Sequence, residues 1–159
     1  MLVKTYAAAV HGVDAQTIIV EVSAGGEVPQ GESFNHSVGL PDSAVKEGFQ
    51  RFEAALSNIG KKVPRLKLVV NMAPADIRKE GSAYDLPIAM GILGATHQMK
   101  PENLGDYMMI GELSLDGGLR PIKGALPIAI QARAEKFKGL ILPKENAREA
   151  AIVLSLIHI

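Results

Sequence analysis

Apolar and polar residues separate most clearly between residues 40 and 60, where the chain reads LPDSAVKEGFQRFEAALSNIG. Four apolar residues recur at spacings of four, three and four, which is typical of one helix face: Val45, Phe49, Phe52 and Leu56. Polar side chains occupy the opposite face: Lys46, Glu47, Gln50, Arg51 and Glu53. Asp42 or Ser43 can cap the start of this helix, and Gly60 can end it. The pattern therefore predicts an amphipathic helix whose apolar face packs on a core.

The remaining segments have the patterns of strands, helices and one hairpin. Four β-branched or apolar runs predict strands: 17–26, 33–40, 65–73 and 139–143. Three more segments predict helices, the first of them apolar nearly all round and therefore buried: 84–97, 124–137 and 144–153. Residues 107–122 predict a hairpin that turns at Asp116-Gly117-Gly118. This mixture of hairpins and crossover helices predicts an α+β, or mixed α/β, fold.

The length and composition suit a single domain. The chain has 159 residues, of which 47% are hydrophobic, enough to form one proper core. We expect that domain at residues 1–153. The final LSLIHI, residues 154–159, is an apolar run without a stop signal. Either the natural chain continues there or a cloning scar follows Val153, so we leave this tail out of the functional interpretation.

Charge and cysteine content narrow the functional classes. Basic and acidic residues number 17 each, so no global charge favours nucleic acid or a membrane surface. The absence of cysteine excludes disulfides, thiolate metal sites and cysteine nucleophiles. The apolar patch in MLVKTYAAAVHGVD is too short for a signal peptide, and no uncharged run approaches the ~18 residues of a membrane span. We therefore expect a cytoplasmic domain with no membrane partner.

The sequence has no recognisable motif for a phosphate, a metal or a cofactor. Neither glycine-rich stretch has the Gly-x-x-x-x-Gly-Lys-Ser/Thr spacing with which backbone N–H groups hold phosphates. No two histidines lie three or four residues apart, so a metal site is not indicated: His11, His36, His97 and His158. One short basic run is better interpreted as a solvated loop than as a phosphate contact, because no aromatic residues interleave with it: Lys61, Lys62, Arg65 and Lys67. We expect neither a cofactor nor a metal in this domain.

The segment RKEGSAYDLPIAMGIL, residues 78–93, has the residue types of an active-site edge. As a helix cap, Ser82 would accept a backbone N–H through its hydroxyl, and Asp85 falls at the spacing of a capping box. As a nucleophile, Ser82 would need an activating base, such as a buried lysine with a lowered pKa. The local chemistry favours the cap.

From Gly81 onward the sequence resembles the proteolytic domain of Lon-type ATP-dependent proteases. Three segments carry this resemblance: RKEG, IGELSLDGGLRPIKGAL and LILPKENAREA. The Lon pattern places its catalytic serine where this chain has Ala83, with Ser82 one residue early. The catalytic lysine of the pattern falls on Leu126. The resemblance thus implies that both members of the dyad are missing, and it leaves a shifted pair of Ser82 with Lys79 or Lys123 as the alternative.

A closer resemblance covers nearly all of residues 1–153. The N-terminal domain of the magnesium-chelatase-like AAA+ proteins of the YifB/ComM (competence protein) type is similar to four segments: VGLPDSAVKEGFQRFEAAL, NMAPADIRKEGSAYDLPIAMGIL, GELSLDGGLRPIKGALPIAI and LPKENAREAAIV. The resemblance implies a ribosomal-protein-S5/Lon fold, followed in family members by an ATPase of the magnesium-chelatase subunit I type.

This resemblance implies a function at the level of a longer parent protein. The implied activity is ATP hydrolysis by a ring-shaped oligomer, linked to DNA handling in natural transformation. ATP and Mg²⁺ would belong to the ATPase module, whose Walker motifs this chain lacks. The domain itself would be a non-catalytic accessory with that module and its ring neighbours as partners, and DNA would be reached through the parent protein. A serine peptidase and a nucleic-acid-binding S5-like module are the alternatives. Ala83 and Leu126 speak against the first, and neutral charge and 4% aromatic residues against the second.

Overall fold

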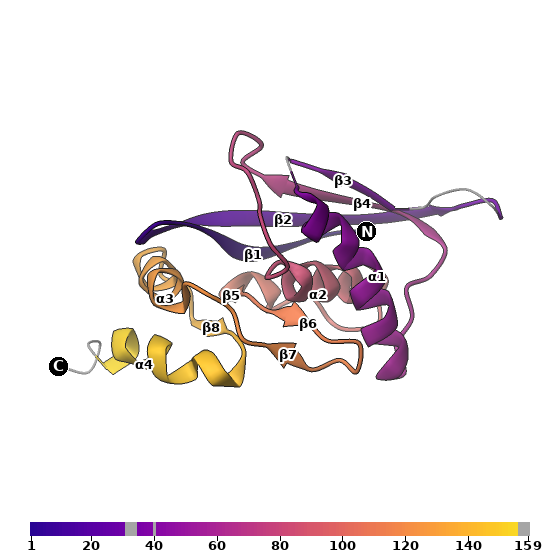
Figure 1. Cartoon of the computed structure of the whole chain (residues 1–159). Helices are drawn as coiled ribbons and strands as arrows, with labels where there is room; N and C mark the ends of the chain where they lie inside the picture. Colours follow the sequence, from indigo (N-terminus) through magenta and orange to yellow (C-terminus); the bar gives the residue numbers. More distant parts are fainter. Residues whose placement is uncertain (31–34, 40, 156–159) are drawn as a thin grey trace.

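The computed structural model describes residues 1–30, 35–39 and 41–155, and in this part of the chain two sheets and four α-helices form (Figure 1). The main sheet has the strand order β3-β4-β2-β1-β5-β8, with these bounds: β1 Leu2–His11, β2 Asp14–Glu27, β3 Asn35–Val38, β4 Leu66–Ala73, β5 Tyr107–Met109 and β8 Gly139–Ile141. A small hairpin and the helices complete the fold: β6 Glu112–Leu113, β7 Leu119–Arg120, α1 Ser43–Asn58, α2 Asp85–Ala95, α3 Ala125–Ala134 and α4 Ala147–Ser155. The main sheet mixes antiparallel and parallel pairs, so the expected mixed α/β class is confirmed.

One face of the main sheet carries the core. Along β2 and β4 alternate residues are buried, because successive side chains of a strand point to opposite faces: Ile18, Val20, Val22, Leu68, Val70 and Met72. The residues between them in β2 and β4 are mostly only partly buried. Helices α1 and α2 lie on one side of these strands (Figure 1). The strands predicted at 17–26 and 65–73 are confirmed, the first within the longer β2.

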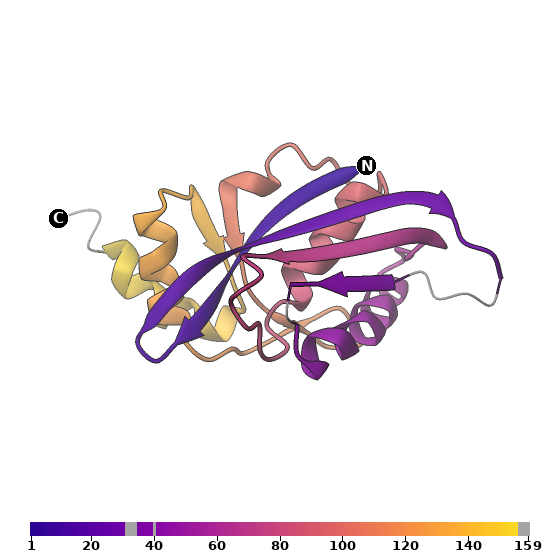
Figure 2. The ribbon, with the colours of Figure 1, turned by 90° about the horizontal axis from the view of Figure 1, so that it is seen from above.

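Strand β1 is the element that the hydrophobic pattern did not predict. Ala7 and Ala8 are both buried, Ala7 in the core with α2 and Ala8 in a second cluster with Met108. Burial alternates from Leu2 to Ala7, but the residue types do not follow it, because Thr5 is buried and Leu2 is exposed. From Ala7 to Ala9 both faces of the strand are covered. Its Thr5 is fully buried and donates its hydroxyl to the carbonyl oxygen of Pro87 at 2.8 Å. In Figure 2, β1 and β2 cross most of the molecule, and both strands contact α2 and α3.

Helix α1 is confirmed at its start and along its apolar face. Asp42 is the cap, since its Oδ1 accepts the N–H of Val45 at 2.9 Å. Phe52 is fully buried, and its ring lies 4.8 Å from that of Phe49 between centroids. Arg51, predicted on the face opposite the apolar one, is not solvent-facing: its side chain is only 22% exposed and donates to the buried carboxylate of Asp85.

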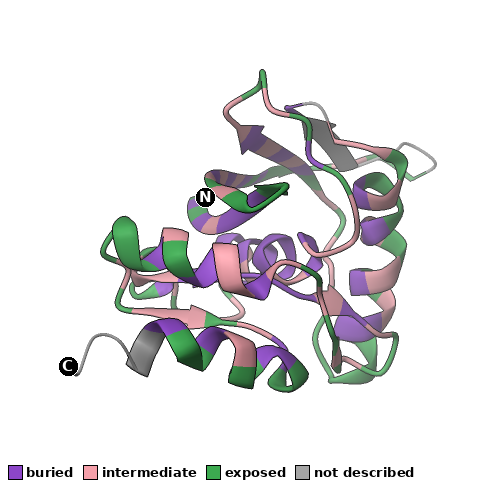
Figure 3. Cartoon of the chain, turned by 60° about the vertical axis from the view of Figure 1, so that its left-hand side comes forward, coloured by how far each residue is buried: buried purple, intermediate pink, exposed green. Residues whose placement is uncertain are grey.

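Helix α2 is buried on nearly all sides, as the sequence predicts, and is mostly purple at the centre of Figure 3. Only Leu86 and Met90 of this helix are partly exposed. Gly91 lets α2 lie close to β2, since a Cβ at this position would come within 2.5 Å of a methyl carbon of Val22. The helix therefore joins the sheet at a distance that only a residue without a side chain allows.

The hairpin predicted at residues 107–122 is shorter than expected. Residues 107–109 form β5 inside the main sheet, parallel to β1 and β8, and only β6 and β7 pair as a hairpin. The turn does lie at Asp116-Gly117-Gly118, with Gly117 in the left-handed region at a φ of 90°. The strand predicted at 33–40 is confirmed at Asn35–Val38, Gly39 follows it as a bend, and residues 33, 34 and 40 lie outside the described part of the chain.

The C-terminal elements agree with their patterns. The strand predicted at 139–143 is β8, and the helices predicted at 124–137 and 144–153 are α3 and α4, the latter preceded by the 3₁₀ turn Lys144–Asn146. The two helices pack together through Ala129, Ala150 and Val153. Helix α4 continues to Ser155, and residues 156–159 of the expected tail lie outside the described residues.

Candidate functional site

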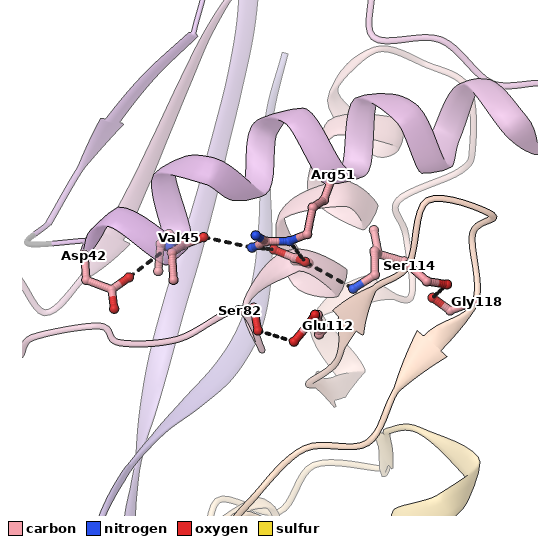
Figure 4. Close-up of polar contacts among 10 residues, drawn as sticks. Asp42, Val45, Arg51, Ser82, Glu112, Ser114 and Gly118 are labelled. Carbon is pink, nitrogen blue, oxygen red and sulfur yellow. Dashed lines mark hydrogen bonds and ion pairs between the residues drawn. The ribbon is translucent and has the colours of Figure 1, made fainter.

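The region around Ser82 is organised by a buried carboxylate, that of Asp85. Figure 4 shows Arg51, Ser82 and Glu112 in this region. Asp85 begins α2, and its side chain is 2% exposed. Arg51 of α1 donates to it twice, from Nε at 2.8 Å and from Nη2 at 3.0 Å, and the backbone N–H of Leu113 in β6 donates at 3.1 Å. The same guanidinium also donates to the carbonyl oxygen of Ala44 at 2.8 Å. One ion pair therefore ties α1, α2 and β6 together.

The electrostatics of this pair follow from its burial. Burial raises the pKa of the Asp85 carboxyl, and the hydrogen bonds from Arg51 and Leu113 act against that rise. The hydrogen bond to Asp85 raises the pKa of Arg51. Burying a carboxylate is costly unless it is paired, so the guanidinium of Arg51 offsets the cost of burying the charge of Asp85.

Ser82 does not cap α2, and this prediction was wrong. Its hydroxyl donates to the Oε2 of Glu112, and no side chain caps this helix. Instead, the carbonyl oxygen of Gly111 accepts the N–H of Leu86 at 3.0 Å. The capping box with Asp85 fails for the same reason, because the Asp85 carboxylate is directed to Arg51 and Leu113. A neighbouring segment, and not the local sequence, supplies the acceptor that the helix start requires.

Lys79, the first lysine of the alternative peptidase pair, is a structural residue in this fold. It is fully buried, and its Nζ donates to the carbonyl oxygens of Gly39 and Pro74. Burial lowers the pKa of Lys79. Its own carbonyl oxygen accepts the N–H of Asp42 at 3.0 Å, and the Asp42 carboxylate accepts the N–H of Gly81 at 2.9 Å. These bonds fasten the loop before Ser82 to the start of α1.

The structure does not assemble a serine–lysine pair from the predicted residues. Within residues 1–30, 35–39 and 41–155, no hydrogen bond joins Ser82 to Lys79 or to Lys123, and Lys123 is exposed. Ala83 is partly buried against the cluster around Met108 and Ile110. Leu126 lies in the first turn of α3 and packs toward α4. The two positions of the Lon register thus carry apolar side chains that serve packing.

The sequence patterns did not predict the two side-chain contacts that organise this region. Arg51 and Asp85 lie 34 residues apart and Ser82 and Glu112 lie 30 apart, so no short motif could reveal either contact. One signal was available, because an aspartate in a helix that is apolar all round needs a cation or several donors. The basic run at Lys61, Lys62, Arg65 and Lys67 is exposed, as its pattern suggests.

The described residues offer neither a metal site nor a membrane-spanning helix. No group of three or more His, Asp or Glu side chains there is placed to hold a metal ion. His11 and His97 are exposed and far apart in the chain, the side chain of His36 is not described, and His158 lies outside the described part. No helix in the part of the chain that the structure covers is long and apolar enough to cross a membrane.

These features define a mixed α/β domain whose Ser82 region is built on an ion pair and on backbone contacts. Comparison with known proteins identifies the family: residues 13–146 match the family described as subunit ChlI of Mg-chelatase, and the chain belongs to it. It is 40% identical over 152 residues to competence protein ComM of Haemophilus influenzae and 39% identical over 142 residues to the uncharacterised protein YifB of Escherichia coli. These matches cover 96% and 89% of this chain but only 29% and 27% of the relatives, so the chain spans under a third of their length.

A more distant relative supports the likeness to proteases. Lon protease 2 of Bacillus subtilis is 30% identical over 104 residues, which is 65% of this chain and 18% of that protein. The resemblance to the YifB/ComM family is thereby confirmed, and the resemblance to Lon is supported at a greater distance.

Proposed function

We propose that this chain is a non-catalytic accessory domain of a magnesium-chelatase-like AAA+ ATPase. Membership of the ChlI family and similarity to ComM support the proposal. Because the chain spans 29% of the length of ComM, a parent protein of that size has room for a separate ATPase module. In this proposal ATP and Mg²⁺ bind to that module. The module and neighbouring copies in a ring are the partners of the domain, and DNA is met through the parent protein during natural transformation in the cytoplasm.

The non-catalytic assignment rests on the hydrogen bonds that Ser82 and Lys79 make in the structure. The hydroxyl of Ser82 donates a hydrogen bond to Glu112, and the amino group of Lys79 donates hydrogen bonds to two carbonyl oxygens. Ala83 and Leu126, at the dyad positions of the Lon register, have no group that transfers a proton. The lowered pKa of Lys79 is the one feature typical of a catalytic lysine, but that lysine is bound to backbone oxygens.

A peptidase assay tests this assignment. The purified chain is incubated with casein and with small peptide esters, alongside the Ser82→Ala variant and a buffer blank. We expect the same background rate in all three. Hydrolysis that Ser82→Ala abolishes would establish the rival function, a Lon-like peptidase with a shifted pair.

A second experiment tests the accessory role in a parent protein that carries the domain. ATP hydrolysis is measured per assembled ring, with and without residues 1–153. We expect that deletion reduces assembly, as followed by sedimentation, and leaves the rate per ring nearly unchanged. Rings that assemble normally but no longer hydrolyse ATP would show that the domain contributes to the ATPase site.

A further inference from the structure

A groove of about 390 Å³ lies between α3, β8 and the start of α4, and none of its lining residues belongs to the Ser82 region. Its apolar lining comes from these three elements and from the residues on either side of β8: Ala129, Ala132, Phe137, Leu140, Leu142 and Ala150. The groove lies within the volume range of ligand pockets, which are mostly apolar with a few polar groups that fix orientation. A site of this shape accepts an apolar side chain of a binding partner.

The rim of the groove is cationic. Arg133, Lys136 and Lys138 line it, and Lys138 is neutralised by Asp106 at 2.7 Å. Among the described residues, no carboxylate lies within ion-pair distance of Arg133 or Lys136. The rim therefore presents two positive charges that the fold does not itself neutralise.

Lys136 holds its place on this rim against a backbone preference. Helix α3 ends with the N–H of Lys136 bonded to the carbonyl of Arg133 at 3.0 Å and the N–H of Phe137 bonded to that of Ala132 at 3.1 Å. This is the Schellman arrangement, in which the residue at the position of Lys136 is left-handed and is usually glycine. Lys136 has a φ of 61°, which a residue with a side chain adopts only at a steric cost. The position thus carries a cation where glycine would suit the backbone better.

We propose that the α3–β8 groove is a docking site for an acidic amphipathic segment of a partner protein. An apolar side chain of the segment packs on Phe137, Leu140 and Leu142, and flanking carboxylates of the segment face Arg133 and Lys136. Charge complementarity selects this occupant, because paired potentials across an interface favour the matching partner and suppress others. A second copy that used the same patch would bring the same two cations together, which opposes such a contact. The proposal concerns a surface apart from Ser82 and holds whether or not the domain hydrolyses peptides.

A random dodecapeptide library displayed on phage is the probe. The immobilised chain is panned against it, and enriched peptides are labelled and titrated by fluorescence anisotropy. We expect enriched sequences in which Leu, Ile or Phe stands beside Asp or Glu, with affinity that falls as salt is added. The variants Lys136→Gly and Arg133→Gln should each weaken binding about two- to fivefold, the range that one exposed ion pair supports. Lys144→Gln, which removes an exposed lysine that does not line the groove, serves as the matched control and should leave binding unchanged.

The Lys136→Gly variant separates docking from folding. Glycine relieves the left-handed strain, so its melting temperature should stay the same or rise while its peptide affinity falls. Four results would overturn the proposal: no enriched peptide, enriched peptides without acidic residues, unchanged affinity in both rim variants, or a homodimer in sedimentation that Lys136→Glu abolishes. The last result would assign the groove to a second copy of this chain.

Discussion

Arg51 illustrates how a charged residue on the polar face of an amphipathic helix can turn inward. Removal of one partner from a buried ion pair costs about 3–5 kcal/mol, because the other charge stays buried without compensation. Since 22% of the Arg51 side chain is exposed, we expect Arg51→Ala to lower the free energy of unfolding by roughly 2–3 kcal/mol. Gln50→Ala, at an exposed neighbouring position, should change it by less than about 0.5 kcal/mol. Urea unfolding of both variants measures the difference, and equal midpoints would mean that the Asp85 pair does not hold α1 in place.

The two roles considered for Ser82, a helix cap and a partner of Glu112, predict opposite stability rankings for Ser82→Ala and Ser82→Asp. Ser82→Ala removes the hydrogen bond to Glu112 and should cost about 0.5–1.5 kcal/mol. A cap would tolerate Ser82→Asp, whereas here the new carboxylate would face that of Glu112. Two like charges at this distance add roughly 1–2 kcal/mol of destabilisation at a partly exposed site. Thermal unfolding should therefore rank Ser82→Asp below Ser82→Ala, and Glu112→Gln should recover part of the loss in the double variant. The reverse ranking would restore the cap.

The contrast between Asp42 and Ser82 shows what sequence can predict at this scale. Asp42 caps α1 through a residue three positions later, so the pattern was sufficient. At the start of α2 the N–H of Leu86 instead donates to the carbonyl oxygen of Gly111, and the hydroxyl of Ser82 donates to Glu112. Both acceptors come from a distant segment. A local rule cannot foresee an acceptor that arrives from another part of the fold.

At the scale of elements, Gly91 provides the sharpest test of how α2 meets the sheet. Alanine is the better helix former by about 1 kcal/mol, so an isolated helix would gain from Gly91→Ala. In this fold the added Cβ would come within 2.5 Å of Val22, a fully buried residue of β2. Overpacking a core costs about 1–3 kcal/mol, so we expect a net loss of stability.

A double-variant cycle provides the control for this prediction. Val22→Ala makes room for the new methyl group, so Gly91→Ala should be less harmful in that background than in the original chain. Urea midpoints of the four proteins yield the coupling between the two sites. Additive effects, or a stabilising Gly91→Ala, would mean that α2 is free to move away from β2.

Elements were predictable where one face meets water and the other meets the core. Helix α1 has this character, and its start and apolar face follow from spacing alone. Strand β1 does not, because Thr5 is buried while Leu2 is exposed, and at Ala7 and Ala8 both faces of the strand are covered. The apolar run at residues 108–110 was predicted as part of a hairpin for the same reason. A run buried on both faces suits either an inner strand or a hairpin arm, and only the parallel partners β1 and β8 decide.

On the scale of the whole molecule, the buried polar contacts near Ser82 connect different elements of the fold. Asp42 fastens the loop of residues 79–81 to α1, and Asp85 fastens α1 to α2 and β6. The region that the Lon likeness marks as an active site is therefore held together by polar contacts between elements. The apolar groove with unpaired rim cations lies among α3, β8 and α4. This division favours binding over chemistry, and it follows from contacts between segments far apart in sequence.

The same accounting of helix starts predicts that the purified chain does not bind ATP. A helix N-terminus holds phosphate through free N–H groups, so an open helix start is the feature to look for. Three of the four described α-helices have an acceptor at their start: Asp42 at α1, the carbonyl of Gly111 at α2, and Glu149 at α3, which accepts the N–H of Leu126 at 3.1 Å. Two of these three acceptors are carboxylates, which would also repel a triphosphate.

Isothermal titration of the chain with ATP and Mg²⁺ should therefore give only heats of dilution at micromolar concentrations. A parent protein that contains the ATPase module is the positive control and should bind under the same conditions. Glu149→Gln tests the reason, since it leaves the hydrogen-bond acceptor in place while removing the charge, and it should still not create a site. A saturable signal from the unmodified chain would mean that ATP is held elsewhere in the domain, and the assignment of nucleotide binding to the separate module would fail.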